Sequence, residues 1–376
     1  GVVNRILRYA LFLSILLFSA CASLSETQTP STEPPTIVVT GAAEEPLTDI
    51  PLAAGYGVKG SWFELYFTNP LSPMAKQKTG GPDGPLVSAI DAARVSADAA
   101  IYSLSLDSAR NAFIRAHNRG VQVRLVMESD NMDNFDVQKV IDAGIPVLGD
   151  RHQGLMHNKF VVIDNAEVWT GSMNLTDSGT YGDNNNFIRI HSAKMAEDYT
   201  HEFNQMFVDD KFGPDKVSGT PNPRVTIDGV PIDVYFSPED HIVDSLLDLV
   251  NGAQQSIYFL AYSFTSDPLG EAIRSRAAAG VTVEGVMDHS QVNSNVGTEF
   301  DPFRQAGLDV RRDGNQFGLM HHKVMIIDSS IVVTGSYNFT DSAEKRNDEN
   351  LIVIYDPQIA AQYLAEFQRV YAQATP

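Results

Sequence analysis

Hydrophobic and polar positions along the chain follow two alternating patterns, one typical of amphipathic helices and one typical of buried strands. In order along the chain, the first set of helix, strand, helix and strand covers residues 85–96, 100–105, 108–118 and 121–127. The same order returns over residues 242–253, 256–263, 268–279 and 281–287. Gly120 and Gly280 follow the second helix of each set, where a C-terminal cap is expected. Helices and strands that alternate in this way predict an α/β fold.

The chain also repeats itself. Between Gly154–Ser178 and Gly318–Ser342, 15 of 25 positions are identical without a gap, which chance similarity does not produce. The offset of 164 residues continues into a helical pattern, in which Tyr199, Glu202 and Phe203 match Tyr363, Glu366 and Phe367. We therefore predict two similar β-α-β-type halves, each with a closing helix, packed about a pseudo-two-fold axis.

The predicted halves cover residues 58–212 and 213–376, and the Gly- and Pro-rich stretch near 210–231 connects them. Residues 22–57 are rich in Ser, Thr, Pro and Glu, a composition that predicts a flexible tether. Both halves lie in one chain, so a monomer is expected to contain the whole repeat.

The first 21 residues have the pattern of a targeting segment. Arg5 and Arg8 precede an apolar run over 9–20, which has the size of a signal-peptide core. The run ends in Phe18-Ser19-Ala20-Cys21, which resembles a bacterial lipobox with Phe18 in place of the usual leucine. The resemblance implies that Cys21 is lipidated and anchors the protein outside the cytoplasm, in the cell envelope. Which membrane carries the anchor stays open.

Each half carries the pattern His-x-Lys-x4-Asp-x6-Gly-Ser-x-Asn. Its polar members are His157, Lys159, Asp164, Ser172 and Asn174 in the first half, and His321, Lys323, Asp328, Ser336 and Asn338 in the second. A His and a Lys two residues apart on a strand point to the same face of a sheet. The Gly-Ser turn and the Asn amide can bind an anion. Two halves would therefore surround one phosphate with two imidazoles, two ammonium groups and two amides.

The doubled motif resembles the signature of the phospholipase D superfamily, and the resemblance covers about residues 60–376. It implies a phosphodiesterase that needs no metal or cofactor, in which one His attacks phosphorus and the other protonates the leaving oxygen. The two exchange acid and base roles when water attacks the phosphohistidine. The resemblance assigns the phosphate oxygens to Lys159, Ser172, Asn174, Lys323, Ser336 and Asn338.

Three acidic residues complete the predicted site. Asp164 and Asp328 lie further along the strand from each His and are expected to support the site rather than to react. Glu349 stands where the first half has Asn185, so the halves differ at this position. A carboxylate on one ring nitrogen raises the basicity of an imidazole and fixes its tautomer. We expect Glu349 to contact His157 across the two halves, which would make His157 the nucleophile and His321 the acid.

The motif names the reaction and leaves the substrate open. With 27 basic and 47 acidic residues the net charge is −20, which is unfavourable for a protein that grips a long stretch of nucleic acid. Charge and tether favour a phospholipase D that acts on glycerophospholipids at a membrane surface. A nuclease is the alternative, because the compact halves lack large inserted loops. Two intact motifs argue against a binding module without activity.

Side chains near the motifs include some that suit nucleic acid and some that suit lipid. The basic ones, which would suit nucleic acid, are Arg151, Arg311, Arg312, Lys345 and Arg346. The apolar ones, which would suit lipid, are Leu155, Met156, Phe317 and Leu319.

Overall fold

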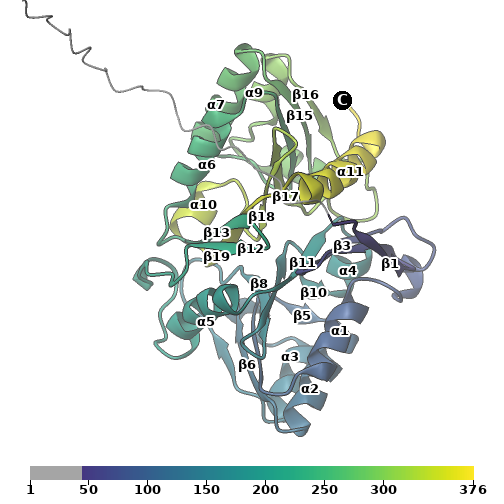
Figure 1. The fold of residues 1–376 in the computed structure, drawn as a ribbon, viewed down its shortest axis with the longest axis vertical. Helices are drawn as coiled ribbons and strands as arrows, with labels where there is room; N and C mark the ends of the chain where they lie inside the picture. Colours follow the sequence, from purple (N-terminus) through teal and green to yellow (C-terminus); the bar gives the residue numbers. More distant parts are fainter. Residues whose placement is uncertain (1–44) are drawn as a thin grey trace, which may run out of the picture. The chain divides into compact units, whose positions relative to one another are not determined.

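The computed structural model describes residues 45–376 (Figure 1). The predicted signal segment with Cys21, and the predicted tether up to residue 44, lie outside the described residues. Residues 45–376 contain no helix with the length and hydropathy of a membrane span.

The first half is built on a nine-stranded sheet with the strand order β1-β2-β3-β11-β9-β8-β4-β6-β7. Its strands are β1 (Thr48–Leu52), β2 (Gly55–Lys59), β3 (Phe63–Thr68), β4 (Ser96–Ile101), β6 (Gln122–Met127), β7 (Val147–Gly149), β8 (Lys159–Ile163), β9 (Glu167–Gly171) and β11 (Asn186–His191). Its α-helices are α1 (Asp83–Ala92), α2 (Asp107–Asn118), α3 (Phe135–Asp142), α4 (Asp177–Tyr181) and α5 (Ala193–Phe207). Two short strands, β5 (Leu104–Ser105) and β10 (Leu175–Thr176), pair separately. Helices α1, α2 and α3 pack on one face of the sheet and α5 on the other.

The second half is built on an eight-stranded sheet with the order β12-β13-β19-β18-β17-β14-β15-β16. Its strands are β12 (Arg224–Ile227), β13 (Val230–Ser237), β14 (Ser256–Ala261), β15 (Thr282–Met287), β16 (Asp309–Arg312), β17 (Lys323–Ile327), β18 (Ile331–Gly335) and β19 (Glu349–Tyr355). Its helices are α6 (Ile242–Gly252), α7 (Asp267–Ala278), α8 (His289–Ser294), α9 (Phe300–Gln305), α10 (Asp341–Lys345) and α11 (Pro357–Gln373).

The two halves share one plan, which confirms the predicted α/β fold class. In each, a parallel β-α-β unit (β4-α2-β6 and β14-α7-β15) lies beside an antiparallel hairpin that carries the motif (β8-β9 and β17-β18). Gly120 and Gly280 have φ of 93° and 100°, a conformation that glycine adopts without a steric penalty. They end α2 and α7 as predicted.

The closing helices α5 and α11 have well-defined starts and one apolar face. The Ser192 hydroxyl accepts a hydrogen bond from Met195 N at the start of α5, and the Asp356 carboxylate caps α11. Pro357 occupies the first turn of α11, where its missing N–H costs nothing. The apolar faces of both helices pack into a core that both halves share.

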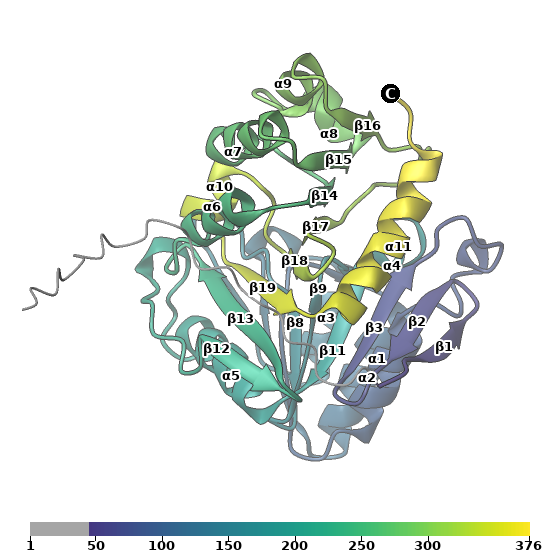
Figure 2. The ribbon, with the colours of Figure 1, turned by 45° about the horizontal axis from the view of Figure 1, so that its top comes forward.

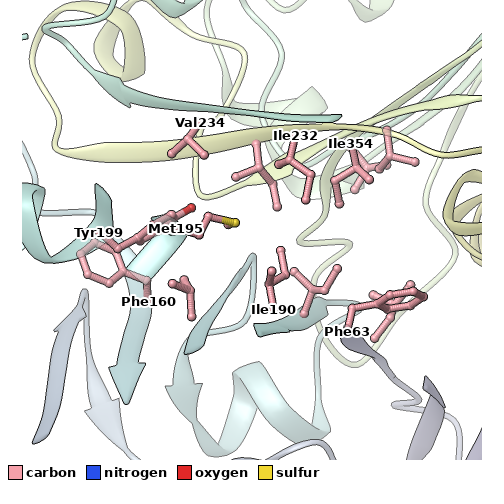
Figure 3. Close-up of a cluster of buried hydrophobic side chains, with 14 of the residues drawn as sticks. Phe63, Phe160, Ile190, Met195, Tyr199, Ile232, Val234 and Ile354 are labelled. Carbon is pink, nitrogen blue, oxygen red and sulfur yellow. The ribbon is translucent and has the colours of Figure 1, made fainter. Parts of the chain in front are cut away.

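This shared core lies between the two sheets (Figure 3). Ile232, Val234 and Ile354 from the second half face Phe160 and Ile190 from the first. Each half also has a core of its own on the far side of its sheet. The interface between the halves is therefore continuous hydrophobic interior and not a loose contact between domains.

Three sequence-based boundaries were wrong. The helix expected over 85–96 is α1 at Asp83–Ala92, so it ends four residues earlier. The strand expected over 100–105 is β4 at Ser96–Ile101, so it starts four residues earlier. The last part of the predicted tether is ordered, because β1 and β2 form a hairpin whose register pairs Thr48 with Lys59 and which extends the first sheet. The composition of this segment suggested a tether, but its β2 strand pairs along the edge of β3.

Candidate active site

The two motifs meet at the interface between the halves through a reciprocal backbone exchange. His157 N donates to Asp348 O (3.0 Å), and His321 N donates to Asn184 O (2.9 Å). Bridges between Met156 and Asp348 and between Met320 and Asn184 repeat the same relation. Each motif therefore pairs with the segment that precedes β11 or β19 of the other half. This exchange is the expected pseudo-two-fold relation at the level of single hydrogen bonds.

The two imidazoles have different partners. Nδ1 of His157 lies 2.9 Å from Oε2 of Glu349, so the contact that the sequence predicted across the halves is present. Nδ1 of His321 lies 2.9 Å from Oδ1 of Asn185 and 3.1 Å from the carbonyl oxygen of Ser172. Since all three partners are acceptors, each Nδ1 carries the proton and each Nε2 is left to react.

The motif serines hold these partners in place. Ser336 Oγ donates to Glu349 Oε2 at 2.6 Å, and Ser172 Oγ donates to Asn185 Oδ1 at 2.8 Å. Both hydroxyls are buried inside the protein. They were predicted to bind substrate, but their donated bonds orient the groups behind the imidazoles.

The two motif lysines are buried beside aromatic rings. Lys159 Nζ donates to His157 O (2.6 Å), and Lys323 Nζ donates to His321 O (2.7 Å). The Lys159 ammonium lies 5.3 Å from the centre of the Tyr102 ring, and the Lys323 ammonium lies 4.8 Å from that of Tyr262. Each ring also meets its motif histidine edge-on. Sequence analysis did not assign these tyrosines to the site. They follow β4 and β14, so their equal place in the repeat was the available signal.

Burial lowers the pKa of all four basic groups, and repulsion by neighbouring cations lowers it further for His157, His321 and Lys323. Burial lowers the pKa of Lys159 to about 7 and lowers the pKa of His157. Burial and the nearby ammonium groups of Lys323 and Lys159 hold the pKa of His321 well below its usual range. Burial and Lys159 do the same to the pKa of Lys323. A bound anion would relieve this repulsion, so the site is built to receive one.

The amides of Asn174 and Asn338 occupy equivalent positions after the two Gly-Ser turns. Their Oδ1 atoms are buried and have no hydrogen-bond partner among residues 45–376. Buried polar groups in native proteins are normally paired, so an unpaired one needs a reason. A phosphodiester offers only acceptor oxygens, so these amides would contact it through their Nδ2 donors, and the unpaired Oδ1 atoms do not themselves indicate a phosphate ligand.

Asp164 and Asp328 serve a different purpose from the predicted one. The Asp164 carboxylate accepts the backbone N–H groups of Arg94, Val95 and Ser96 at 2.7–3.1 Å. The Asp328 carboxylate does the same for residues 254–256. Both follow the carboxyl end of a motif strand, one strand length from the lysine that starts it. They fix the helix-to-strand turn before β4 and β14 and do not support the imidazoles.

Sequence analysis missed a buried polar network beneath His321. His322 is fully buried, with Nε2 2.9 Å from Glu366 Oε1 and Nδ1 3.0 Å from Asn186 Nδ2. Asn186 Nδ2 also donates to Ser172 Oγ. The corresponding position of the first half is Asn158, so this difference between the repeats was the only signal.

One group among residues 45–376 offers ligands of the kind that metals prefer, namely Asp288, His289 and Asp313. Asp288 already accepts three backbone N–H bonds, one of them from Met320 N beside His321. Asp313 accepts Asn315 N (3.0 Å) and lies 3.2 Å from His289 Nδ1. These contacts give the group a role in holding the loops of the site.

Comparison with known proteins also finds one phospholipase D-like domain in each half. A family model described as "Cardiolipin synthase, PLD-like domain" matches residues 86–207 and 246–371, one match in each half. A phospholipase D of Rickettsia bellii is 33% identical over 155 residues, which are 40% of this chain and 76% of that protein. The mitochondrial cardiolipin hydrolase of Mus musculus is 33% identical over 131 residues, 35% of this chain and 58% of the relative. The chain thus spans little more than half of that hydrolase.

Two solved structures are similar to this one. The phosphatidylserine synthase of Haemophilus influenzae has a TM-score of 0.61 and 14% identity, covering 86% of this chain and 89% of its own, which shows a common fold. The phospholipase D family member Nuc of Salmonella typhimurium is 31% identical, with a TM-score of 0.36, over 39% of this chain and 97% of its own. Since the family match covers both halves and more than half of the chain, the protein belongs to the family of phospholipase D-like domains and is a phosphodiesterase-type hydrolase.

Proposed function

We propose that the protein is a phospholipase D that hydrolyses the head-group ester of glycerophospholipids through a phosphohistidine intermediate. The observation that carries the proposal is the unequal pair of imidazoles, one on a carboxylate (His157–Glu349) and one on an amide (His321–Asn185). A displacement in two steps needs one nucleophile and one proton donor, and the two partners suit these two tasks.

In the first step His157 Nε2 attacks phosphorus, and the bond from phosphorus to the head-group oxygen breaks. The attack leaves a positive charge on the imidazole, which the Glu349 carboxylate stabilises through Nδ1. His321 enters this step as an imidazolium, protonated on both ring nitrogens, and its Nε2 gives a proton to the departing oxygen. Lys159 and Lys323 stabilise the negative charge on the remaining phosphate oxygens.

In the second step His321 takes a proton from water, and the water oxygen bonds to phosphorus. The phosphorus–nitrogen bond to His157 then breaks, which releases a phosphatidic acid and restores both imidazoles. Asn185 and the Ser172 carbonyl hold His321 in one orientation throughout, so the same Nε2 serves as acid and then as base.

A lipid substrate is favoured over nucleic acid because most of the basic side chains near the motifs are already paired with carboxylates. Three of the five candidates already have carboxylate partners, in the pairs Arg151–Asp210, Arg311–Asp309 and Lys345–Asp341. Burial raises the pKa of Asp183, close to Lys323, to about 6. A long nucleic-acid footprint needs several free cations along its path, so this rim favours a substrate with a single phosphate.

The proposal includes attachment to a membrane through lipidated Cys21, on the extracytoplasmic side of the cell envelope. Its support is the lipobox-like sequence, and its test is labelling with radioactive palmitate. A Cys21→Ser variant should take up no label and should leave the membrane fraction. Label on that variant would exclude Cys21 as the site.

The activity test compares phosphatidylcholine vesicles with plasmid DNA, in the presence of EDTA, using the full chain. We expect release of head group and phosphatidic acid, with DNA left intact. His157→Ala should lower the rate by roughly 10²–10⁴-fold, the contribution of a positioned catalytic group. DNA cleavage without lipid turnover would favour a nuclease, and loss of all activity in EDTA would exclude the metal-independent mechanism.

A further inference from the structure

Two apolar side chains project almost fully into solvent at the edge of the second sheet that carries His321. Phe317 is 89% exposed and Val296 is 97% exposed. Strands β14, β15 and β16 run parallel and side by side (Figure 2), so their carboxyl ends lie at one edge. Val296 lies in the connection from α8 to α9, beyond β15, and Phe317 lies in the loop from β16 to β17. That loop leads directly into His321.

The Phe317 loop is fixed on both sides of its tip. Before the tip, the buried Asn315 donates through Nδ2 to Gly182 O of the first half (2.9 Å). After the tip, Leu319 N donates to Asp183 Oδ1 (2.9 Å), and Leu319 O accepts from Asn184 N (2.8 Å). These bonds hold the backbone on both sides of Phe317, so the tip of the loop that carries the ring is fixed in position.

The first half shows that the fold does not need an aromatic side chain at this position. Its loop has equivalent anchors, in which Leu155 N donates to Asn347 Oδ1 (3.0 Å) and Leu155 O accepts from Asp348 N (2.8 Å). The residue at the tip is Gln153, 164 positions before Phe317 and likewise exposed. The same backbone thus carries a polar tip in one half and an aromatic tip in the other.

Single exposed hydrophobic residues are common on protein surfaces and need no explanation by themselves. Phe317 differs from such residues in its position, because it lies four residues before the catalytic His321. Aromatic side chains favour the boundary between water and lipid, where the ring leaves water at little cost. On β16, which ends at this edge, Arg311 is paired with Asp309 and the Arg312 guanidinium lies over the Phe300 ring, 4.3 Å from its centre.

We propose that Phe317, together with Val296, inserts into the surface of a lipid bilayer and sets the mouth of the active site against it. This inference rests on the proposed lipid hydrolysis and adds how the active site would reach its substrate. Because contact is apolar and the protein carries a net charge of −20, zwitterionic phosphatidylcholine is the expected surface. Insertion of these two side chains would bring the lipid phosphate groups close to His321.

The test measures the depth of single tryptophans in the full chain bound to phosphatidylcholine vesicles. The protein's own tryptophans, Trp62 and Trp169, are buried, so their emission is a constant background that the parent protein supplies. Phe317→Trp and Val296→Trp place a probe at the proposed contact. Val95→Trp is the matched control, because Val95 is 59% exposed and precedes β4, at the opposite edge of its sheet from the site.

We expect brominated acyl chains to quench the probe at position 317 at least twofold more than the probe at 95, and aqueous iodide to show the reverse order. Position 296 should behave like 317, which keeps the test valid if one variant folds poorly. Equal quenching at 317 and 95, or quenching of 317 by iodide alone, would overturn the proposal. So would quenching of 317 by single-stranded DNA and not by lipid. Since no turnover is measured, a failure here is separate from a failure of the proposed activity.

Discussion

At His157 the ring nitrogen Nδ1 lies 2.9 Å from a carboxylate oxygen, whereas at His321 the same atom lies 2.9 Å from an amide oxygen. A carboxylate stabilises a positively charged imidazole more than an amide does, because its interaction with the charge is ionic. The phosphohistidine form carries such a charge, so His157 is the better nucleophile. His321 holds its proton less tightly and is the better donor to a leaving oxygen.

The first prediction concerns this carboxylate. A Glu349→Gln variant keeps the shape of the side chain but removes its charge, so the phosphohistidine loses its stabilisation. We expect kcat to fall by about 10²-fold or more, the range of a lost positioned acid–base partner. Rapid-quench trapping of the phosphorylated enzyme measures the first step directly. Retention of the parent rate of phosphoenzyme formation would show that His157 does not need the charge.

The second prediction concerns pH. Burial and two ammonium groups hold the pKa of His321 well below its usual range in the free enzyme. The acid must be protonated, so kcat/KM should fall as pH rises through that low pKa. A bound phosphodiester is negative and raises the pKa of His321, so the alkaline limb of kcat should lie at higher pH than that of kcat/KM.

Rate profiles from pH 4 to 9 on a soluble phosphodiester measure both limbs. An Asn185→Glu variant places a carboxylate on His321 and should move the alkaline limb of kcat/KM to higher pH. Coincident limbs for kcat and kcat/KM in the parent protein, together with no shift in the variant, would contradict this account of His321.

At the scale of elements, the motif aspartates hold a turn and not an imidazole. Asp164 follows β8 with a positive φ of 55° and accepts three backbone N–H bonds from the turn between α1 and β4. Asp328 follows β17 with a φ of 52° and makes the same bonds. A charged acceptor for consecutive N–H groups fixes where β4 and β14 begin, and these strands lie next to the motif strands.

The third prediction follows from this geometry. Asp164→Ala removes three accepted bonds and places alanine at a positive φ, so we expect a loss of about 2–3 kcal/mol in the free energy of unfolding. KM and kcat of the folded variant should change less than threefold, because the carboxylate is remote from the imidazoles. Urea denaturation and steady-state kinetics test the two parts. A large fall in kcat with full stability would return Asp164 to the catalytic site.

The elements that sequence predicted well are those whose signal is local or repeated. Helices α2, α6 and α7 begin and end within a residue or two of the periodic patterns, and the Gly caps were visible. The β1–β2 hairpin was missed because it ends a segment rich in Ser, Thr, Pro and Glu, and only pairing with β3 makes it part of a sheet. The start of β4 was misplaced because Asp98 interrupts the apolar run, yet Asp98 pairs with Arg124 inside the protein.

The site was predictable to the same extent. The repeat gave both histidines, both lysines and both amides, and the difference between Asn185 and Glu349 gave the contact with His157. The sequence did not indicate that both motif aspartates hold a turn and not an imidazole, since that depends on where each motif strand ends in space. The network of His322, Glu366 and Asn186 joins residues far apart in the chain, so no local pattern could reveal it.

At the scale of the whole molecule, a buried cation joins the two halves beside the site, in addition to their shared hydrophobic core. Lys216 lies in the connection between the halves, and its ammonium group is fully buried. It contacts Glu202 of α5, Ser237 O (3.1 Å), and Asp348 Oδ1 (3.2 Å) beside Glu349. Glu239 Oε2 is also 3.2 Å away. Although burial alone would lower the pKa of Lys216, these carboxylates raise it, so the lysine stays charged.

The last prediction is that this cation carries much of the attachment between the halves. Lys216→Met fills the same space but leaves buried carboxylates without their cation, and breaking a buried ion pair costs about 3–5 kcal/mol. Burial and Glu239 already raise the pKa of Glu202 well above its usual range, and the variant should raise the carboxylate pKa values further. Acids with a raised pKa in the folded state bind protons on folding, so the variant should regain stability as pH falls.

Urea denaturation at pH 8 and pH 5 measures the effect, and the deficit relative to the parent should be smaller at pH 5. Lys345→Met is the matched control, because Lys345 pairs with Asp341 on the surface, where both side chains are largely exposed. That pair should contribute less than about 1 kcal/mol at either pH. If both variants lost the same small amount, the connection between the halves would depend on the shared apolar core alone. A large deficit confined to Lys216→Met would instead mean that the segment carrying Asp348 and Glu349 is held against the first half by charge.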